Sequence, residues 1–193
     1  MELLTPYLAR ARTARIAPFI RGSVLDLGCG SHGVSAVYDQ YCVQMTDYCG
    51  IERSQESVLK LKKRYPKQQF FARDLDRDRL ELDRKFDCIL MIALVEHLFN
   101  QQHVMSEVVN ALNPDGIIVM TTPTPFGNDI VHRLGASLGL FAKAAVDDHI
   151  VIYNHHRFRL MAGEVGLHLK TYKTFQFFCN QIAVLEKSSL SAR

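Results

Sequence analysis

The segment VLDLGCGSHG, residues Val24–Gly33, joins a short apolar run to a glycine-rich loop. Gly28, Gly30 and Gly33 follow the G-x-G-x-x-G spacing of a dinucleotide-binding turn, in which the backbone comes close to a pyrophosphate. Asp26 argues against a pyrophosphate here, because two like charges about 4 Å apart repel by roughly 4 kcal/mol at an effective dielectric near 20. The segment therefore indicates an α/β fold whose ligand tolerates a neighbouring carboxylate.

Strand-like and helix-like segments alternate on both sides of this loop. Strands are predicted at Ser23–Leu27, Tyr48–Glu52, Gln69–Ala72, Phe86–Ala93 and Ile117–Thr121, and helices at Val34–Met45, Gln55–Arg64 and Val104–Leu112. Phe86–Ala93 is continuously apolar apart from Asp87, as expected of a buried parallel strand. The alternation predicts a doubly wound, Rossmann-like parallel sheet with helices on both faces.

The C-terminal part follows a different pattern. A helix is predicted at His155–Val165, followed by two strands at Leu167–Phe178 and Gln181–Glu186. Only two residues separate these strands, which is too few for a crossover, so they should pair as an antiparallel hairpin. The complete prediction is a sheet of about seven strands, mostly parallel, with an antiparallel C-terminal hairpin.

Composition predicts a single cytoplasmic domain spanning residues 1–193. The net charge of +3 is too small to indicate a nucleic-acid partner, and no apolar run approaches the roughly 18 residues of a membrane span. The five cysteines contain no C-x-x-C pair and are expected to be reduced. Residues 1–20 are predicted to be a helical lead-in and residues 122–156 a lid on the substrate side, whereas nothing indicates the oligomeric state.

Acidic residues follow the predicted strands at the edge where parallel sheets bind ligands. Asp26, Glu52 and Asp74 belong to the first three strand ends, while Asp87 lies before the apolar run of its strand, away from the carboxyl end, and is expected to be structural. A row of carboxylates suits a cationic or polyol ligand. S-adenosylmethionine has this chemistry, with a positive amino group and sulfonium and two ribose hydroxyls.

Five segments resemble, in order and spacing, the motifs of class I S-adenosylmethionine-dependent methyltransferases, particularly the small-molecule type 11 group. They are VLDLGCG (Val24–Gly30), GIERS (Gly50–Ser54), ARDLD (Ala72–Asp76), FDCILMIALVEHL (Phe86–Leu98) and NPDGIIVMTTP (Asn113–Pro123). One departure is that Ser31-His32 displaces the third glycine of the first motif to position 33. The resemblance implies methyl transfer from S-adenosylmethionine, which leaves S-adenosylhomocysteine.

The resemblance also implies roles for individual residues. Asp26 would meet the amino end of the cofactor, Glu52 the ribose hydroxyls, and Asp74 the adenine amino group, with Leu75 beside the ring. The full set of implied cofactor-binding residues is Asp26, Gly28, Cys29, Gly30, Glu52, Arg53, Asp74, Leu75, Ile92 and Ala93. Asp47 is an alternative to Glu52, and Asp76 and Asp78 are alternatives to Asp74. Cys29 is expected to pack closely and not to act as a nucleophile.

His97 is the candidate for a catalytic base, and the alternative is that Glu96 and His97 only line the edge of the site. His149, His155 and His156, with Asp147 and Asp148, match no known ligand spacing, so no metal is predicted. The predicted function is methyl transfer to a small or medium-sized molecule by in-line displacement, catalysed mainly by orientation. The alternatives are a nicotinamide-dependent oxidoreductase and a non-catalytic cofactor-binding or scaffold protein of the same fold.

Overall fold

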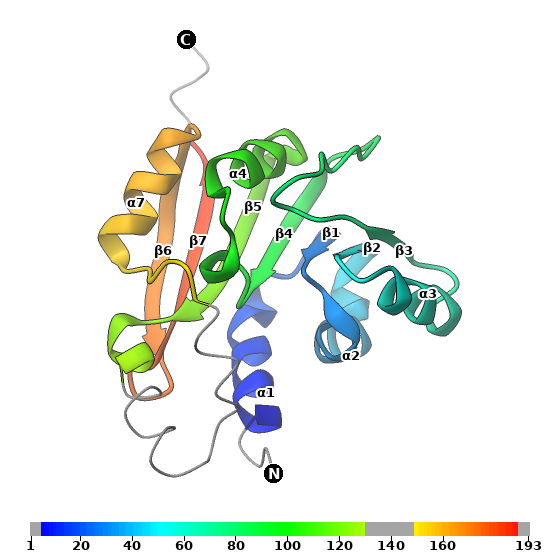
Figure 1. Cartoon of the computed structure of the whole chain (residues 1–193), viewed down its shortest axis with the longest axis horizontal. Coiled ribbons are helices and arrows are strands. Elements are labelled where there is room, and N and C mark those ends of the chain that lie inside the picture. Colours follow the sequence, from blue (N-terminus) through cyan, green and yellow to red (C-terminus); the bar gives the residue numbers. More distant parts are fainter. Residues whose placement is uncertain (1–4, 130–148, 189–193) are drawn as a thin grey trace.

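A computed structural model describes residues 5–129 and 149–188 of the chain. The described residues form one seven-stranded sheet in the order β3-β2-β1-β4-β5-β7-β6, with only β7 antiparallel to its neighbours (Figure 1). The strands are β1 (Gly22–Leu27), β2 (Met45–Glu52), β3 (Gln69–Ala72), β4 (Phe86–Ile92), β5 (Leu112–Pro123), β6 (Leu167–Phe175) and β7 (Asn180–Lys187). The predicted architecture is thus confirmed, including the antiparallel hairpin.

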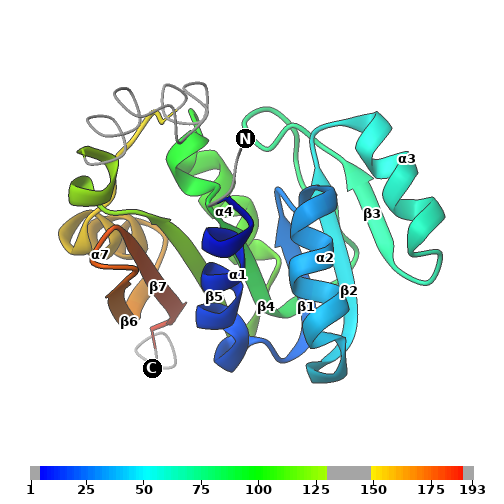
Figure 2. The same cartoon turned by 90° about the horizontal axis from the view of Figure 1, so that it is seen from below.

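Helices cover both faces of the sheet, and each face has its own apolar core (Figures 1 and 2). One face is covered by α1 (Thr5–Ile16), α2 (Gly30–Tyr41) and α3 (Gln55–Arg64), and the other by α4 (Gln101–Asn110) and α7 (His155–Glu164). Short 3-10 helices lie at η1 (Ala17–Phe19), η2 (Cys42–Gln44) and η3 (Val95–His97). None of the helices among the described residues is long and apolar enough to cross a membrane.

Local signals define α3 and β3 well, and both occur with the predicted bounds. The side chain of Ser54 accepts a hydrogen bond from the backbone N–H of Ser57, which caps the helix. Lys62, Lys63 and Arg64 lie in the last turn, where positive charge favours the helix dipole. The helix ends before Pro66, which cannot continue it.

Several other bounds differ from the predictions. The helix predicted from Val34 begins at Gly30 and ends at Tyr41, so Met45 is the first residue of β2. Asn100 caps α4 through the N–H of His103, and the helix begins three residues earlier than predicted. β5 includes a register shift between its Leu112 pair and its regular pairing from Ile117, because the N-P-D-G turn lies inside the strand.

The hairpin turn and the predicted lid also differ from simple expectations. β6 ends at Phe175, because Gln176, Phe177 and Phe178 have positive φ values of 51°, 54° and 66° and turn the chain back. The predicted lid, residues 122–156, begins with the end of β5 and a helical segment at 125–129. Residues 130–148 of this lid lie outside the described residues, so its role stays a prediction.

Replacing Gly22 with alanine is expected to destabilise the chain by about 1–3 kcal/mol. Gly22 has φ +61°, and a Cβ there would lie 2.3 Å from Oδ2 of Asp87. That carboxylate accepts hydrogen bonds from the N–H of Ser23 and the side-chain amide of Asn113, so it cannot move freely. In α7, Gly163→Ala is the control, since nothing lies within 4 Å of its new Cβ. Thermal unfolding compares the two variants, and an unchanged Tm for Gly22→Ala would contradict the expectation.

Candidate active site

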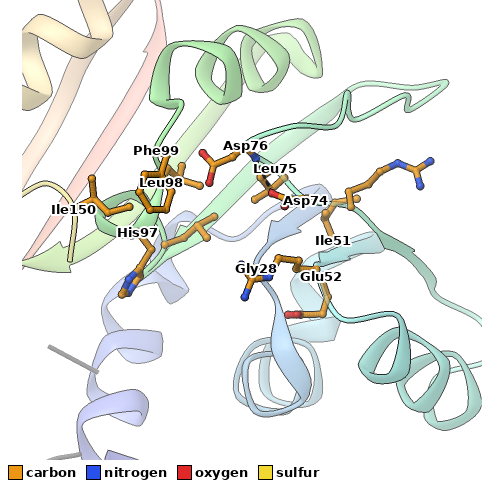
Figure 3. Close-up of a pocket in the computed structure, with 13 residues that line it drawn as sticks. Gly28, Ile51, Glu52, Asp74, Leu75, Asp76, His97, Leu98, Phe99 and Ile150 are labelled. Carbon is orange, nitrogen blue, oxygen red and sulfur yellow. Dashed lines mark hydrogen bonds between the residues drawn. The ribbon is translucent and has the colours of Figure 1, made fainter. Parts of the chain in front are cut away.

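A cleft of about 560 Å³ opens at the carboxyl ends of β1 to β4 (Figure 3). Its size lies within the usual range of about 300–1,000 Å³ for small-molecule sites. In the view of Figure 3, Glu52 and Asp74 lie on one side of Gly28 and His97 on the other. The lining residues are Gly28, Ile51, Glu52, Arg53, Arg73, Asp74, Leu75, Asp76, Leu94, His97, Leu98, Phe99 and Ile150.

Glu52 connects the glycine loop to the start of α3. Its Oε2 accepts a hydrogen bond of 3.1 Å from the N–H of Gly30, and its Oε1 accepts one of 3.1 Å from the N–H of Ser54. The carboxylate is therefore held at the rim of the cleft, with lone pairs left to accept from hydroxyl groups. Asp47, its rival in the sequence, lies inside β2 and forms an ion pair with Arg84 away from the cleft.

Asp26 lies within β1 and is buried, and it is not among the residues that line the cleft. Tyr48 donates a hydrogen bond of 2.6 Å from its hydroxyl to Oδ2 of Asp26. Burial raises the pKa of Asp26 to about 7, and the hydrogen bond from Tyr48 opposes that rise. The carboxylate can therefore change charge near neutral pH, whereas its contact with the amino end of a cofactor stays a prediction.

Four further members of the predicted cofactor set do not line the cleft: Cys29, Gly30, Ile92 and Ala93. Cys29 is buried, its N–H donates to the carbonyl of Ile51, and burial raises the pKa of its thiol, which suits packing and not nucleophilic attack. Ile92 packs against the core below the sheet edge. Ala93 has φ +49°, and its N–H donates to the carbonyl of Thr121, which directs the chain into η3.

The acidic residues after β3 form a small hydrogen-bonded turn. Asp74 and Asp76 both line the cleft, while Asp78 accepts a hydrogen bond from the N–H of Asp74. Asp76 Oδ1 accepts a hydrogen bond of 2.7 Å from the N–H of Asn100, which ties this turn to α4. Asp74, Leu75 and Asp76 therefore all line the cleft, while the adenine contacts predicted for Asp74 and Leu75 stay a prediction.

Other lining residues escaped the sequence analysis. Arg73 directly precedes the predicted acid, Leu94 and Phe99 flank the E-H-L segment, and Ile150 comes from the other end of the chain. Phe99 is 81% exposed. A large exposed apolar side chain beside a cleft indicates a binding surface, but its exposure cannot be predicted from the sequence alone. Leu94 contacts the glycine loop, since a Cβ on Gly28 would lie 2.9 Å from its Cδ1.

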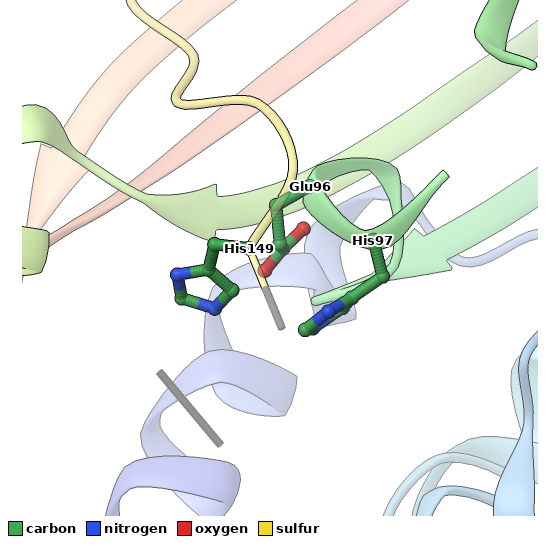
Figure 4. Close-up of side chains that lie close together, drawn as sticks. All are labelled: Glu96, His97 and His149. Atoms are coloured by element: carbon green, nitrogen blue, oxygen red, sulfur yellow. The ribbon is translucent and has the colours of Figure 1, made fainter. Parts of the chain in front are cut away.

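Glu96 and His97 occupy η3 at the far side of the cleft. His97 lines the cleft, while Glu96 is buried behind it beside His149 (Figure 4). Burial raises the pKa of Glu96, and the backbone N–H of Glu96 itself, followed by the neighbouring His97 and Arg12, opposes that rise. The hydroxyl of Thr122 is near enough to favour the charged form but makes no hydrogen bond of good geometry with the carboxylate. A catalytic role for His97 stays a prediction.

The profile of a protein family described as "Methyltransferase domain" matches residues 2–171 of the chain. The chain belongs to this methyltransferase family. The methyltransferase predicted from the five sequence motifs is thereby confirmed. No protein of curated function matches the sequence.

Solved structures of low sequence identity share the fold of this methyltransferase. An S-adenosylmethionine-dependent methyltransferase from Clostridium acetobutylicum is 13% identical, with a TM-score of 0.65 over 94% of this chain and 90% of that one. Magnesium protoporphyrin IX methyltransferase from Synechocystis, with bound S-adenosylhomocysteine, is 16% identical, with a TM-score of 0.64 over 94% and 83%. The plantazolicin methyltransferase, in complex with a triazolic desmethylPZN analogue and S-adenosylhomocysteine, is 15% identical, with a TM-score of 0.71 over 95% and 86%. The class I fold is therefore common to all four proteins.

Proposed function

We propose that this methyltransferase transfers the sulfonium methyl group of S-adenosylmethionine to a small or medium-sized molecule in the cleft. The observation that carries the proposal is the position of Glu52, fixed by the N–H groups of Gly30 and Ser54 at the rim of the cleft. A carboxylate held in this way can accept hydrogen bonds from two vicinal ribose hydroxyls. The bound S-adenosylhomocysteine in the magnesium protoporphyrin IX and plantazolicin enzymes supports the same cofactor here.

The remaining lining residues suit the other parts of this cofactor. Asp74 and Leu75 offer an acceptor and an apolar surface for the adenine, and the positive φ of Gly28 lets the backbone approach the methionine part. The methyl group would then face the side of the cleft formed by His97, Phe99 and Ile150, where the acceptor would bind. The carboxylates of the cleft partly balance the positive charge of the bound cofactor. The sulfonium keeps its own positive charge, which makes its methyl group reactive.

Transfer is an in-line displacement at carbon, and orientation supplies most of the catalysis. The sulfonium sulfur is a good leaving group, so the protein has to align the acceptor behind the methyl group and exclude water. A base is required only when the acceptor must lose a proton, as a hydroxyl does. Membership of a methyltransferase family favours methyl transfer over nicotinamide-dependent oxidation. A measurement of catalytic turnover distinguishes an enzyme from a non-catalytic scaffold.

Two measurements test the proposal. S-adenosylhomocysteine at about 100 times its Kd is expected to stabilise the chain by about 2.7 kcal/mol in thermal unfolding, whereas NAD(H) should have no effect. Radiolabelled S-adenosylmethionine, supplied with cell extract or a panel of small molecules, should then label a low-molecular-weight product. Stabilisation by NAD(H) without a response to S-adenosylhomocysteine would contradict the cofactor assignment, and cofactor binding without labelling of any acceptor would favour the scaffold.

A further inference from the structure

Glu96, His97 and His149 bring one carboxylate and two imidazoles together beside the cleft (Figure 4). One ligand atom from each side chain lies within 4.8 Å of the other two. A point at most about 2.8 Å from all three atoms therefore exists, since 4.8 Å divided by the square root of three is about 2.8 Å. Zinc binds nitrogen and oxygen at about 2.0–2.2 Å, so shifts of less than 1 Å would complete the coordination.

The fold builds this cluster from two distant segments. The 3-10 helix η3 carries Glu96 and His97, and the backbone carbonyl of Glu96 accepts hydrogen bonds from the N–H groups of Ile150 and Val151. These two bonds place His149 next to Glu96, although 52 residues separate His97 from His149 along the chain. Backbone hydrogen bonds therefore hold the two segments that carry the three side chains side by side.

The carboxylate of Glu96 lacks the partners that a buried charge needs. Glu96 is 1% exposed, and neither of its oxygens has a hydrogen-bond partner among the described residues. Leaving a carboxylate in this state is costly, and a bound cation is one of the usual remedies. Arg12 is near enough to attract the charge, but within the described part of the chain it forms no ion pair with Glu96.

The imidazole of His149 has the hydrogen bond that orients a metal-binding histidine. Its Nδ1 lies 2.9 Å from Oδ1 of Asn128. A hydrogen bond to this acceptor requires the proton on Nδ1, and in that tautomer Nε2 carries the lone pair. Histidines that bind metals almost always donate their other N–H to an oxygen in this way, which fixes the tautomer and the orientation of the ring.

We propose that Glu96, His97 and His149 bind a divalent transition-metal ion of the zinc class, and that this ion holds a hydroxyl group of the methyl acceptor. Two imidazoles with one carboxylate favour zinc and its neighbours over magnesium or calcium. Three protein ligands leave a coordination position open, as catalytic zinc sites do. His97 belongs to both the cluster and the cleft, so an ion in the cluster would border the cleft in which the acceptor is proposed to bind.

The role of the ion rests on the proposed function, and it names a class of acceptor. Coordination to such an ion would lower the pKa of an acceptor hydroxyl, so its proton would leave to solvent and its oxygen would be free to attack. That oxygen forms a bond to the methyl carbon while the carbon–sulfur bond breaks and its electron pair stays on sulfur. The products are a methyl ether and neutral S-adenosylhomocysteine, and the cleft needs no separate base.

Metal binding is tested directly on the full chain after treatment with chelator. Titration with Zn²⁺ followed by calorimetry and elemental analysis should show one ion per chain. His149→Ala and the isosteric Glu96→Gln should each weaken Zn²⁺ binding at least tenfold, because each removes one of three ligands. His156→Ala is the matched control, since His156 is an exposed histidine at the start of α7, outside the cluster. Co²⁺ adds a spectroscopic readout. The visible absorption of Co²⁺ should change when wild type is added and should not change when either ligand variant is added.

The outcomes separate this inference from the proposed function. Binding of S-adenosylhomocysteine to all four proteins without stoichiometric Zn²⁺ in wild type would overturn the metal site, leaving Arg12 as the neighbour that balances Glu96. Zn²⁺ binding that the ligand variants lose, with no S-adenosylhomocysteine bound, would support the site and contradict the proposed function. Equal Zn²⁺ binding by wild type, His149→Ala and Glu96→Gln would also overturn the site, because the ion would then be held elsewhere.

Discussion

Replacing Glu52 with alanine is expected to weaken binding of S-adenosylhomocysteine by about 1.5–3 kcal/mol, or about 10- to 150-fold. The variant removes the charge-assisted hydrogen bonds proposed to the ribose hydroxyls. It also removes the acceptors that hold the N–H groups of Gly30 and Ser54, so the glycine loop and the start of α3 lose a shared anchor. Calorimetric titration at pH 7 measures the loss.

Two further variants show which of these effects dominates. Glu52→Gln keeps an oxygen for one of the backbone N–H groups but removes the charge. Compared with Glu52→Ala, it should restore the Tm more fully than it restores the affinity for S-adenosylhomocysteine. Glu56→Ala removes an exposed carboxylate whose one ion pair within residues 5–129 and 149–188 is with Lys60, and this variant should bind as wild type does. Wild-type affinity in Glu52→Ala would contradict the placement of the ribose. A fall in affinity matched by a fall in Tm, and rescued fully by Glu52→Gln, would assign Glu52 a structural role instead.

The sequence predicted the sheet well because its signals are local or involve neighbouring strands. The Ser54 cap and the proline after α3 act within a few residues, and the two-residue link between the predicted C-terminal strands permits only an antiparallel pair. The start of α2 was placed four residues late, at Val34. Gly30, Ser31 and His32 are poor helix formers, and the helix begins there because Glu52, from another strand, accepts the N–H of Gly30.

The side of the cleft that carries the acidic residues could be predicted from local signals, whereas the side near His97 and Ile150 could not. Glu52, Asp74 and Leu75 follow strand ends, so strand assignment alone places them at one edge of the sheet. His149 and Ile150 reach the cleft through backbone bonds to Glu96, a contact between segments with no shared pattern. A contact between segments so far apart along the chain depends on tertiary structure, and no residue spacing in the sequence predicts it.

Replacing Asp26 with asparagine is expected to stabilise the chain at pH 8 by up to about 4 kcal/mol. Burial raises the pKa of Asp26 from 3.8 to about 7, and each pKa unit corresponds to about 1.4 kcal/mol between the two protonation states. The folded chain holds this proton more tightly than the unfolded chain does. Its contribution to stability is therefore complete below about pH 4 and is lost as the pH rises towards 7. Asparagine has no proton to lose and can still accept from the hydroxyl of Tyr48.

Urea unfolding of wild type and Asp26→Asn between pH 4 and pH 8 tests this, with Asp87→Asn as a control of opposite sign. Hydrogen bonds from Ser23 and Asn113 lower the pKa of Asp87, so its contribution is present at neutral pH and lost in acid, and Asp87→Asn should destabilise at pH 8. A wild-type plot of unfolding free energy against pH that runs parallel to that of Asp26→Asn would contradict the raised pKa.

If Asp26 also meets the amino group of the cofactor, the stabilised variant should bind S-adenosylhomocysteine more weakly. The affinity of wild type should then rise as the pH increases through 7.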